Sequence, residues 1–63
     1  MGKKIIPVEA LKLALSREEE SIALYKRLSA DNPVAKDIFT FLSDEEHKHK
    51  KLLEKKIFEA TRY

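Results

Sequence analysis

The sequence predicts an all-α protein, an antiparallel two-helix hairpin that dimerises into a four-helix bundle. Its 63 residues include one Gly and two Pro, and 38% of them are charged. This composition is typical of long helices whose outer faces are exposed to solvent. Apolar residues recur at intervals of three and four in two long stretches, and only residues 30–33 interrupt the pattern with turn residues.

A single domain over residues 1–63 is small enough to need extra stabilisation. Domains of about 60 residues bury only around 60% of the surface that their unfolded chains expose. The chain has no Cys, which excludes disulfides and thiolate metal sites. The remaining sources of extra stabilisation are a metal held by His and carboxylates, or self-association.

The first helix is expected over about residues 7–30, with Pro7 in its first turn. Glu18 lies at the centre of the apolar face, on one seam with Leu11 and Tyr25 at seven-residue spacing. An ionised carboxylate there is costly unless it is paired or binds a metal. Both interpretations stay open, an ion pair with a Lys or Arg and metal ligation. The expected inner positions are Val8, Leu11, Ala14, Leu15, Glu18, Ile22, Tyr25 and Leu28.

The connection between the helices is short. Asp31 or Asn32 can cap the second helix, and Pro33 can occupy its first turn. So short a connection makes the two helices antiparallel neighbours. A lone hairpin leaves one apolar groove exposed, and pairing of two copies covers it.

The second helix is expected over about residues 33–60. His49 falls in the middle of its apolar stripe and Glu46 at the edge. Residues three apart share one face, so the two form either a metal-binding pair or a chance pairing in a charged helix. His47 lies on the opposite side, where we expect solvent. The expected inner positions are Val34, Ile38, Phe41, Leu42, Leu52, Leu53 and Ile57.

Charge and hydropathy exclude two classes of partner. The net charge is +2 and the pI about 9.0, but the lysines fall among acidic neighbours, which indicates a solvated face and no nucleic-acid partner. No stretch approaches the 18 or so apolar residues that span a membrane. Glu9 and Lys12 interrupt what would be the core of a signal peptide, so a cytoplasmic location is expected. These lysines are Lys48, Lys50, Lys51 and Lys55.

Each hairpin offers one Glu from the first helix and a Glu-x-x-His pair from the second. A two-fold dimer then supplies four carboxylates and two imidazoles, the ligand set of ferritin-like di-iron proteins. Glu18-x6-Tyr25 followed by Glu46-x-x-His49 resembles the rubrerythrin branch of that superfamily. The resemblance covers residues 7–57. It is also carried by the segments ALKLA (10–14), SIALYKRL (21–28) and EEHKHKKLL (45–53).

The chain looks like a ferritin-like half domain. It has a single hairpin, as in the encapsulated ferritins, which build their site between chains, and it lacks the cysteine-rich rubredoxin module. The resemblance implies iron ligation by Glu18, Glu46 and His49, with Glu46 bridging the two metals and Tyr25 as a hydrogen-bond partner of a ligand. Glu45 is a rival ligand, since it stands one helical turn from His49. Iron, two ions per dimer, is the expected cofactor, with manganese or zinc as alternatives.

Three functions follow as alternatives. The first is oxidation of ferrous iron by dioxygen or peroxide at an interchain site in a homodimer or higher homo-oligomer, in iron handling or oxidative-stress defence. The second is a peroxide reductase that uses an external electron donor at the same site. The third is a metal-free dimeric hairpin that acts as a binding module, for example for RNA through its lysines.

Overall fold

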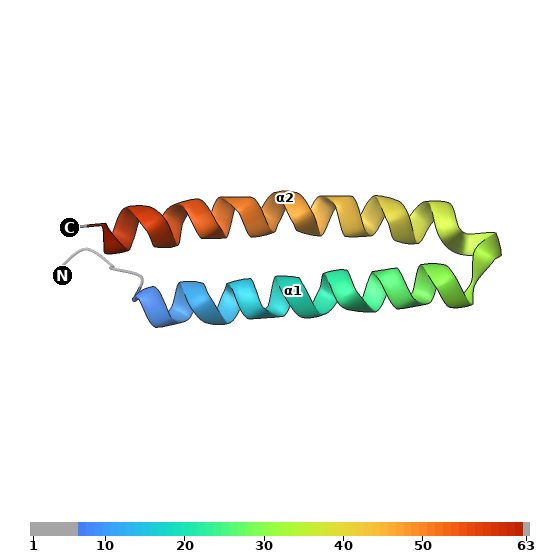
Figure 1. Cartoon of the computed structure of the whole chain (residues 1–63), viewed down its shortest axis with the longest axis horizontal. Helices are drawn as coiled ribbons and strands as arrows, with labels where there is room; N and C mark the ends of the chain where they lie inside the picture. The colour runs from blue at the N-terminus through green and yellow to red at the C-terminus, as the bar shows by residue number, and fades with distance from the viewer. Residues whose placement is uncertain (1–6, 63) are drawn as a thin grey trace, which may run out of the picture.

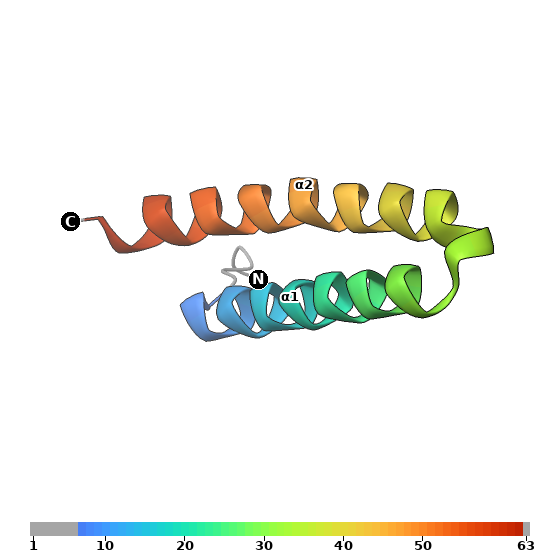
Figure 2. The same ribbon diagram turned by 45° about the vertical axis from the view of Figure 1, so that its right-hand side comes forward.

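The computed structural model describes residues 7–62, and they form a helical hairpin. Helix α1 spans Val8–Asp31 and helix α2 spans Lys36–Thr61, with the 3-10 helix η1, Pro33–Ala35, between them. The two long helices run antiparallel and side by side, as both views show (Figures 1 and 2). The molecule measures 50 × 24 × 14 Å, so it is a single layer of helices. The predicted all-α hairpin is confirmed.

Helix α1 begins at Val8, one residue later than expected. Pro7 precedes it as the N-cap, and its carbonyl oxygen accepts hydrogen bonds from the N–H groups of Ala10 and Leu11 at 3.0 and 3.3 Å. Proline fits this position because the ring fixes its φ and the missing N–H is not needed there. The start of the helix is therefore set by local chemistry.

In the connection between the helices, Asn32 caps the end of α1 and not, as predicted, the start of the second helix. Its side-chain amide and its backbone N–H both donate to the carbonyl oxygen of Leu28, at 3.0 and 2.9 Å, so Asn32 closes α1. Neither η1 nor α2 has a side-chain hydrogen bond at its N-cap, and the expectation that Asp31 or Asn32 caps the second helix is wrong. Pro33 begins η1, and α2 starts three residues later, at Lys36. The tighter 3-10 turn reverses the chain before the longer helix begins.

The inner face of α1 is the predicted one. All eight positions expected to face inward are less exposed than the rest of the surface, with Ile22 the most buried at 8% exposure. Within residues 7–62, Ile22 is the one buried hydrophobic side chain, and no large side chain is completely enclosed. The predicted periodicity is thus right, but one hairpin makes a thin core.

The inner face of α2 differs from the prediction. Four of the seven residues expected there are exposed in the hairpin, and the contact with α1 instead follows a line that includes the buried Ser43 and the half-buried Glu46. The reason is that α2 carries two neighbouring apolar arcs, and α1 is wide enough to cover only one of them. Leu42, Leu53 and Ile57 belong to the covered arc. The exposed four are Val34, Ile38, Phe41 and Leu52, at 102, 51, 57 and 63%.

One side of the hairpin collects five of the six large exposed apolar residues of α1 and α2, all except Phe58. At about 100° per residue, each of them is turned roughly 80–140° in the same sense from Glu18 or Glu46, which face the partner helix. In two antiparallel helices, equal rotation from the contact line leads to the same side. We call this the apolar flank; it consists of Leu13, Leu24, Ile38, Phe41 and Leu52. No helix in the described part of the chain has the length and apolarity to cross a membrane.

Candidate metal centre

The structure brings the three predicted ligands together halfway along the hairpin. Glu18 lies near the middle of α1, and Glu46 and His49 lie near the middle of α2. Because the helices are antiparallel and similar in length, their midpoints face each other. One ligand atom from each of the three side chains falls within 4.8 Å of the other two.

The carboxylates are hidden and the imidazole lies at the rim. Nδ1 of His49 is 3.2 Å from Oε1 of Glu46 and 3.8 Å from Oε1 of Glu18. The Glu18 and Glu46 side chains are 24 and 23% exposed, against 51% for His49. The sequence analysis had placed His49 in the middle of the apolar face and Glu46 at its edge. The structure reverses them, because the contact line on α2 passes through Glu46 and leaves His49 between this line and the apolar flank.

Glu18 has no Lys or Arg partner in the described part of the chain, and the basic group nearest to it among the ion pairs is the imidazole of His49 at 3.8 Å. Its Oε1 is screened from solvent and accepts no hydrogen bond there. No Lys or Arg of residues 7–62 forms an ion pair with it. The cations nearby are paired elsewhere, Lys50 with Glu19 and Arg17 with Glu20, both at 3.6 Å. A hidden carboxylate oxygen without a donor is costly, so the ion-pair interpretation of Glu18 gains no support here.

The two carboxylates perturb each other in opposite directions. The adjacent Glu46 raises the pKa of Glu18, because protonated Glu18 can donate a hydrogen bond to it, and burial raises it further. The pKa of Glu46 is lowered, because its ionised form accepts hydrogen bonds from Glu18 and His49. The pair therefore loses its two protons in order as the pH rises, Glu46 first and Glu18 later. A cation bound between the two oxygens would favour the form in which both are ionised.

Glu45, the rival ligand, does not join this group within one hairpin. Its carboxylate accepts a hydrogen bond from Nζ of Lys48 at 3.2 Å and is 38% exposed. It points about 100° away from Glu46 around α2, toward the apolar flank. Within one hairpin, therefore, Glu46 and not Glu45 is the α2 carboxylate beside His49.

Tyr25 lies away from the three ligands. Its ring stacks on Phe39, with centroids 6.3 Å apart and an angle of 20° between the planes. Two helical turns, about 10 Å of rise, separate it from Glu18 along α1. Its suggested role as a hydrogen-bond partner of a ligand stays a prediction.

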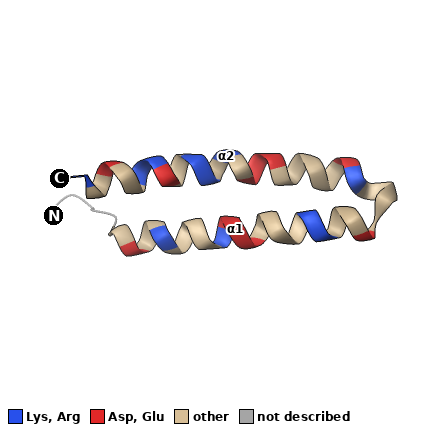
Figure 3. Ribbon diagram, viewed as in Figure 1, with Lys and Arg blue, Asp and Glu red and all other residues tan. Residues whose placement is uncertain are grey.

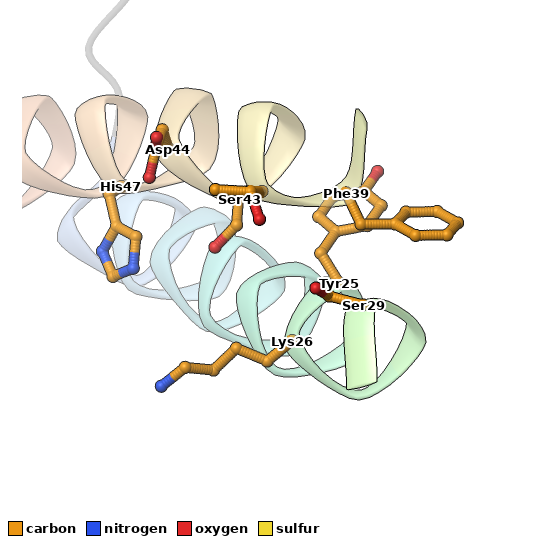
Figure 4. A pocket seen from close by; sticks show the side chains of 8 residues that line it. Tyr25, Lys26, Ser29, Phe39, Ser43, Asp44 and His47 are labelled. Carbon is orange, nitrogen blue, oxygen red and sulfur yellow. The ribbon is translucent and has the colours of Figure 1, made fainter. Parts of the chain in front are cut away.

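Sequence reasoning missed a pocket beside this aromatic pair. Its volume is about 280 Å³, and Figure 4 shows side chains from both helices around it. The available signal was Ser43, a small polar residue on the contact line. His47 lies in this pocket, exposed and away from His49, as expected. The lining residues are Tyr25, Lys26, Ser29, Phe39, Thr40, Ser43, Asp44 and His47.

The donor set fits a divalent metal. Two carboxylates and an imidazole are ligands that iron, manganese and zinc accept. Two donors bound to one ion at about 2.1 Å lie no more than about 4.2 Å apart, so small side-chain rotations would contract the observed 4.8 Å spread to a binding geometry. Oε1 of Glu18, which accepts no hydrogen bond from the described residues, is the atom that would bind such a cation.

Comparison of the chain with models of known protein families, with curated proteins and with solved structures gives no match. The residues themselves are thus the basis for any functional conclusion. Two features bear on it, the Glu18, Glu46 and His49 group and the apolar flank beside it.

Proposed function

We propose that two copies of the chain pair through the apolar flank and complete a two-metal carboxylate site, at which ferrous iron is bound and oxidised. The observation that carries this proposal is the Glu18, Glu46 and His49 group. Its ligand atoms lie within 4.8 Å of one another, and one carboxylate oxygen is hidden from solvent with no hydrogen-bond donor in residues 7–62. The resemblance of the sequence to half-bundle ferritin-like proteins points the same way.

The exposed apolar residues support pairing of two hairpins. Five large side chains on one flank are 40–63% exposed, whereas Ile22 is the single buried hydrophobic residue of those described. Exposed apolar residues gathered on one side of a small fold favour an interaction surface there. Four-helix bundles solve the same problem by packing one hairpin on another.

The position of His49 supports a site shared between the copies. Its imidazole is half exposed and lies between the contact line and the apolar flank. A second hairpin packed on this flank would bring its own carboxylates and imidazole toward the first set. The assembled site would hold four carboxylates, whose four negative charges two divalent ions neutralise.

The residues have distinct tasks in this proposal. Glu18 and Glu46 bind the cations as carboxylates, while His49 adds a nitrogen ligand at the rim. Residues of the apolar flank exclude water from the completed site. The bound iron supplies the redox chemistry: two ferrous ions each lose one electron to dioxygen, which takes up two protons and leaves as hydrogen peroxide.

Anaerobic titration with ferrous iron, combined with native mass spectrometry, tests the proposal. We expect a dimer that binds about two ions, as a site of this type requires. Admission of oxygen should then consume about one dioxygen per two ions oxidised. Glu18→Ala and His49→Ala should lose the bound iron, and Glu54→Gln, an exposed carboxylate on α2, serves as the matched control. Unchanged iron content in both ligand variants would overturn the assignment.

The oxidant can be assigned with the same protein. If hydrogen peroxide oxidises the bound iron faster than dioxygen does, and a reduced carrier protein restores the ferrous state, the site works as a peroxide reductase. If dioxygen is the faster oxidant and no carrier is needed, the site works as a ferroxidase. Both outcomes use Glu18, Glu46 and His49.

A further inference from the structure

The outward face of the second half of α2 carries a row of cations and one aromatic ring. Lys48, Lys51, Lys55 and Phe58 follow one another at intervals of three and four, so they form a single strip along the helix. Arg62 directly follows the end of α2 and extends the row. We call these five residues the basic strip. Figure 3 shows that Lys and Arg recur along this half of α2, with acidic residues between them.

Little of the positive charge in the basic strip is neutralised within the hairpin. Lys51 and Lys55 are exposed and form no ion pair with any residue between 7 and 62. Lys48 pairs with Glu45 but keeps 72% of its side chain exposed. Like charges held close together on one helix face repel one another. This repulsion within the basic strip lowers the stability of the isolated hairpin. A bound anionic group would relieve it.

Phe58 is the second unusual feature of the strip. It is 61% exposed and points away from both α1 and the apolar flank, so pairing of two hairpins through the flank leaves it in solvent. The guanidinium of Arg62 lies over its ring, 5.4 Å from the centroid. An outward-facing aromatic side chain with a cation stacked on it is typical of binding surfaces.

Acidic residues farther along the same face of α2 limit the length of a negatively charged partner that the basic strip can bind. At about 1.5 Å per residue, the strip from Lys48 to Arg62 is roughly 21 Å long. Toward the turn, the same face of α2 continues with Asp44 and Asp37. A long uniform polyanion, such as a nucleic acid, or a flat anionic membrane would meet these carboxylates. The surface therefore fits a partner whose negative charge is confined to about 21 Å.

An extended peptide segment meets this limit. About six residues at roughly 3.3 Å each span the strip. Carboxylates on alternate residues stand roughly 6.6 Å apart on one side of such a segment, close to the spacing of about 4.5–6 Å between successive lysines of the strip. An apolar side chain near one end would contact Phe58.

We propose that the basic strip binds a short, extended, acidic segment of a partner protein, with carboxylates facing Lys48, Lys51 and Lys55 and an apolar side chain against Phe58. This surface lies about a quarter turn around α2 from the apolar flank. Binding there is independent of the metal site and of the proposed pairing of two copies.

The test measures binding of a fluorescent heptapeptide, Glu-Ser-Glu-Ser-Glu-Ser-Leu with blocked ends, to the full chain at low salt by anisotropy; its three carboxylates and its Leu side chain lie on one side of the extended peptide. Lys51→Glu combined with Lys55→Glu should weaken binding by about 10-fold or more, because two attractive contacts become repulsive. The matched control, Lys12→Glu with Lys26→Glu, makes the same change in net charge on α1 and should stay within about two-fold. Phe58→Ala should weaken binding by about three-fold or more with the charges unchanged. Far-ultraviolet circular dichroism confirms that each variant is helical.

The alternatives are outcomes of the same experiment. Tighter binding of a ten-nucleotide oligothymidylate or of phosphatidylserine vesicles than of the heptapeptide, at equal ionic strength, overturns the proposal. Equal losses in the strip variant and the α1 control also overturn it, since binding would then follow net charge alone. Loss of self-association in the strip variant would assign the surface to a second copy of this chain and overturn it as well. None of these results depends on metal, so failure here leaves the proposed iron site untouched.

Discussion

Two adjacent layers of the contact between α1 and α2 differ sharply. Toward the turn, Ile22 and Ser43 are each 8% exposed, and the Tyr25 ring stacks on Phe39. One helical turn away, the equivalent places hold Glu18 and Glu46, two carboxylates that are three-quarters hidden and have no Lys or Arg partner within the described chain. The first layer contributes stability. The second layer places two carboxylates side by side, so we expect it to oppose folding in the metal-free protein, as the proposed metal site requires.

Ile22→Ala should break the first layer and have the largest effect on stability. Removal of a well-buried Ile side chain costs about 2–4 kcal/mol in unfolding free energy, a large part of the total for a domain of this size. Urea denaturation at fixed protein concentration measures it. Phe58→Ala, which removes an exposed ring, should cost less than about 0.5 kcal/mol. A small loss at Ile22 would mean that this layer is not the core of the protein.

Metal binding should sharpen the contrast, because it should change the second layer from one that lowers the free energy of unfolding into one that raises it. A ligand present at about 100 times its dissociation constant stabilises the folded state by about 2.7 kcal/mol. Ferrous or manganous ion should therefore raise the urea midpoint of the wild type by this order, and a chelator should reverse the shift. Glu18→Gln should show no such shift. An equal shift in wild type and variant would place metal binding elsewhere.

The sequence predicted the first layer better than the second. On α1 most apolar residues share one phase and only Leu13 and Leu24 lie on the flank, so Ile22 and the inward position of Glu18 followed from spacing alone. On α2 two apolar arcs adjoin, and periodicity cannot tell which of them faces α1 and which faces a second chain. For this reason His49 was expected inside and Glu46 at the edge, and Ile38 was expected within the hairpin, where it is 51% exposed.

The ends of the helices also divide into those that local sequence decides and those that depend on the path of the whole chain. The start of α1 after Pro7 was predicted to within one residue, because local chemistry decides it. The 3-10 turn and the capping of α1 by Asn32 were not predicted. Asn32 can cap either the helix before it or the helix after it, and the path of the chain makes the choice.

Glu18→Gln should stabilise the metal-free protein at pH 7, which would confirm that the second layer opposes folding. The change keeps the shape of the side chain and removes the repulsion between two carboxylates, so a gain of a few tenths to about 1 kcal/mol is expected. Urea denaturation in the presence of chelator measures the gain, and Glu54→Gln should leave the midpoint within experimental error. A loss of stability in Glu18→Gln would mean that the carboxylate is satisfied in the wild type, and the metal assignment would lose its physical basis.

The smallest predicted effect is the pH dependence of that gain. The pKa of Glu18 is raised in the folded state, so its protonated form stabilises the fold below the unfolded value, and this contribution is lost as the pH rises through the folded value. The glutamine variant has no such group. Its advantage over the wild type should thus be near zero at pH 4.5, the ordinary value for Glu, and should grow toward pH 7.5. Glu46 interacts directly with Glu18, so its titration also changes in the variant, and the difference between the two proteins reports the carboxylate pair as a unit. An advantage that shrinks with rising pH would contradict the raised pKa of Glu18.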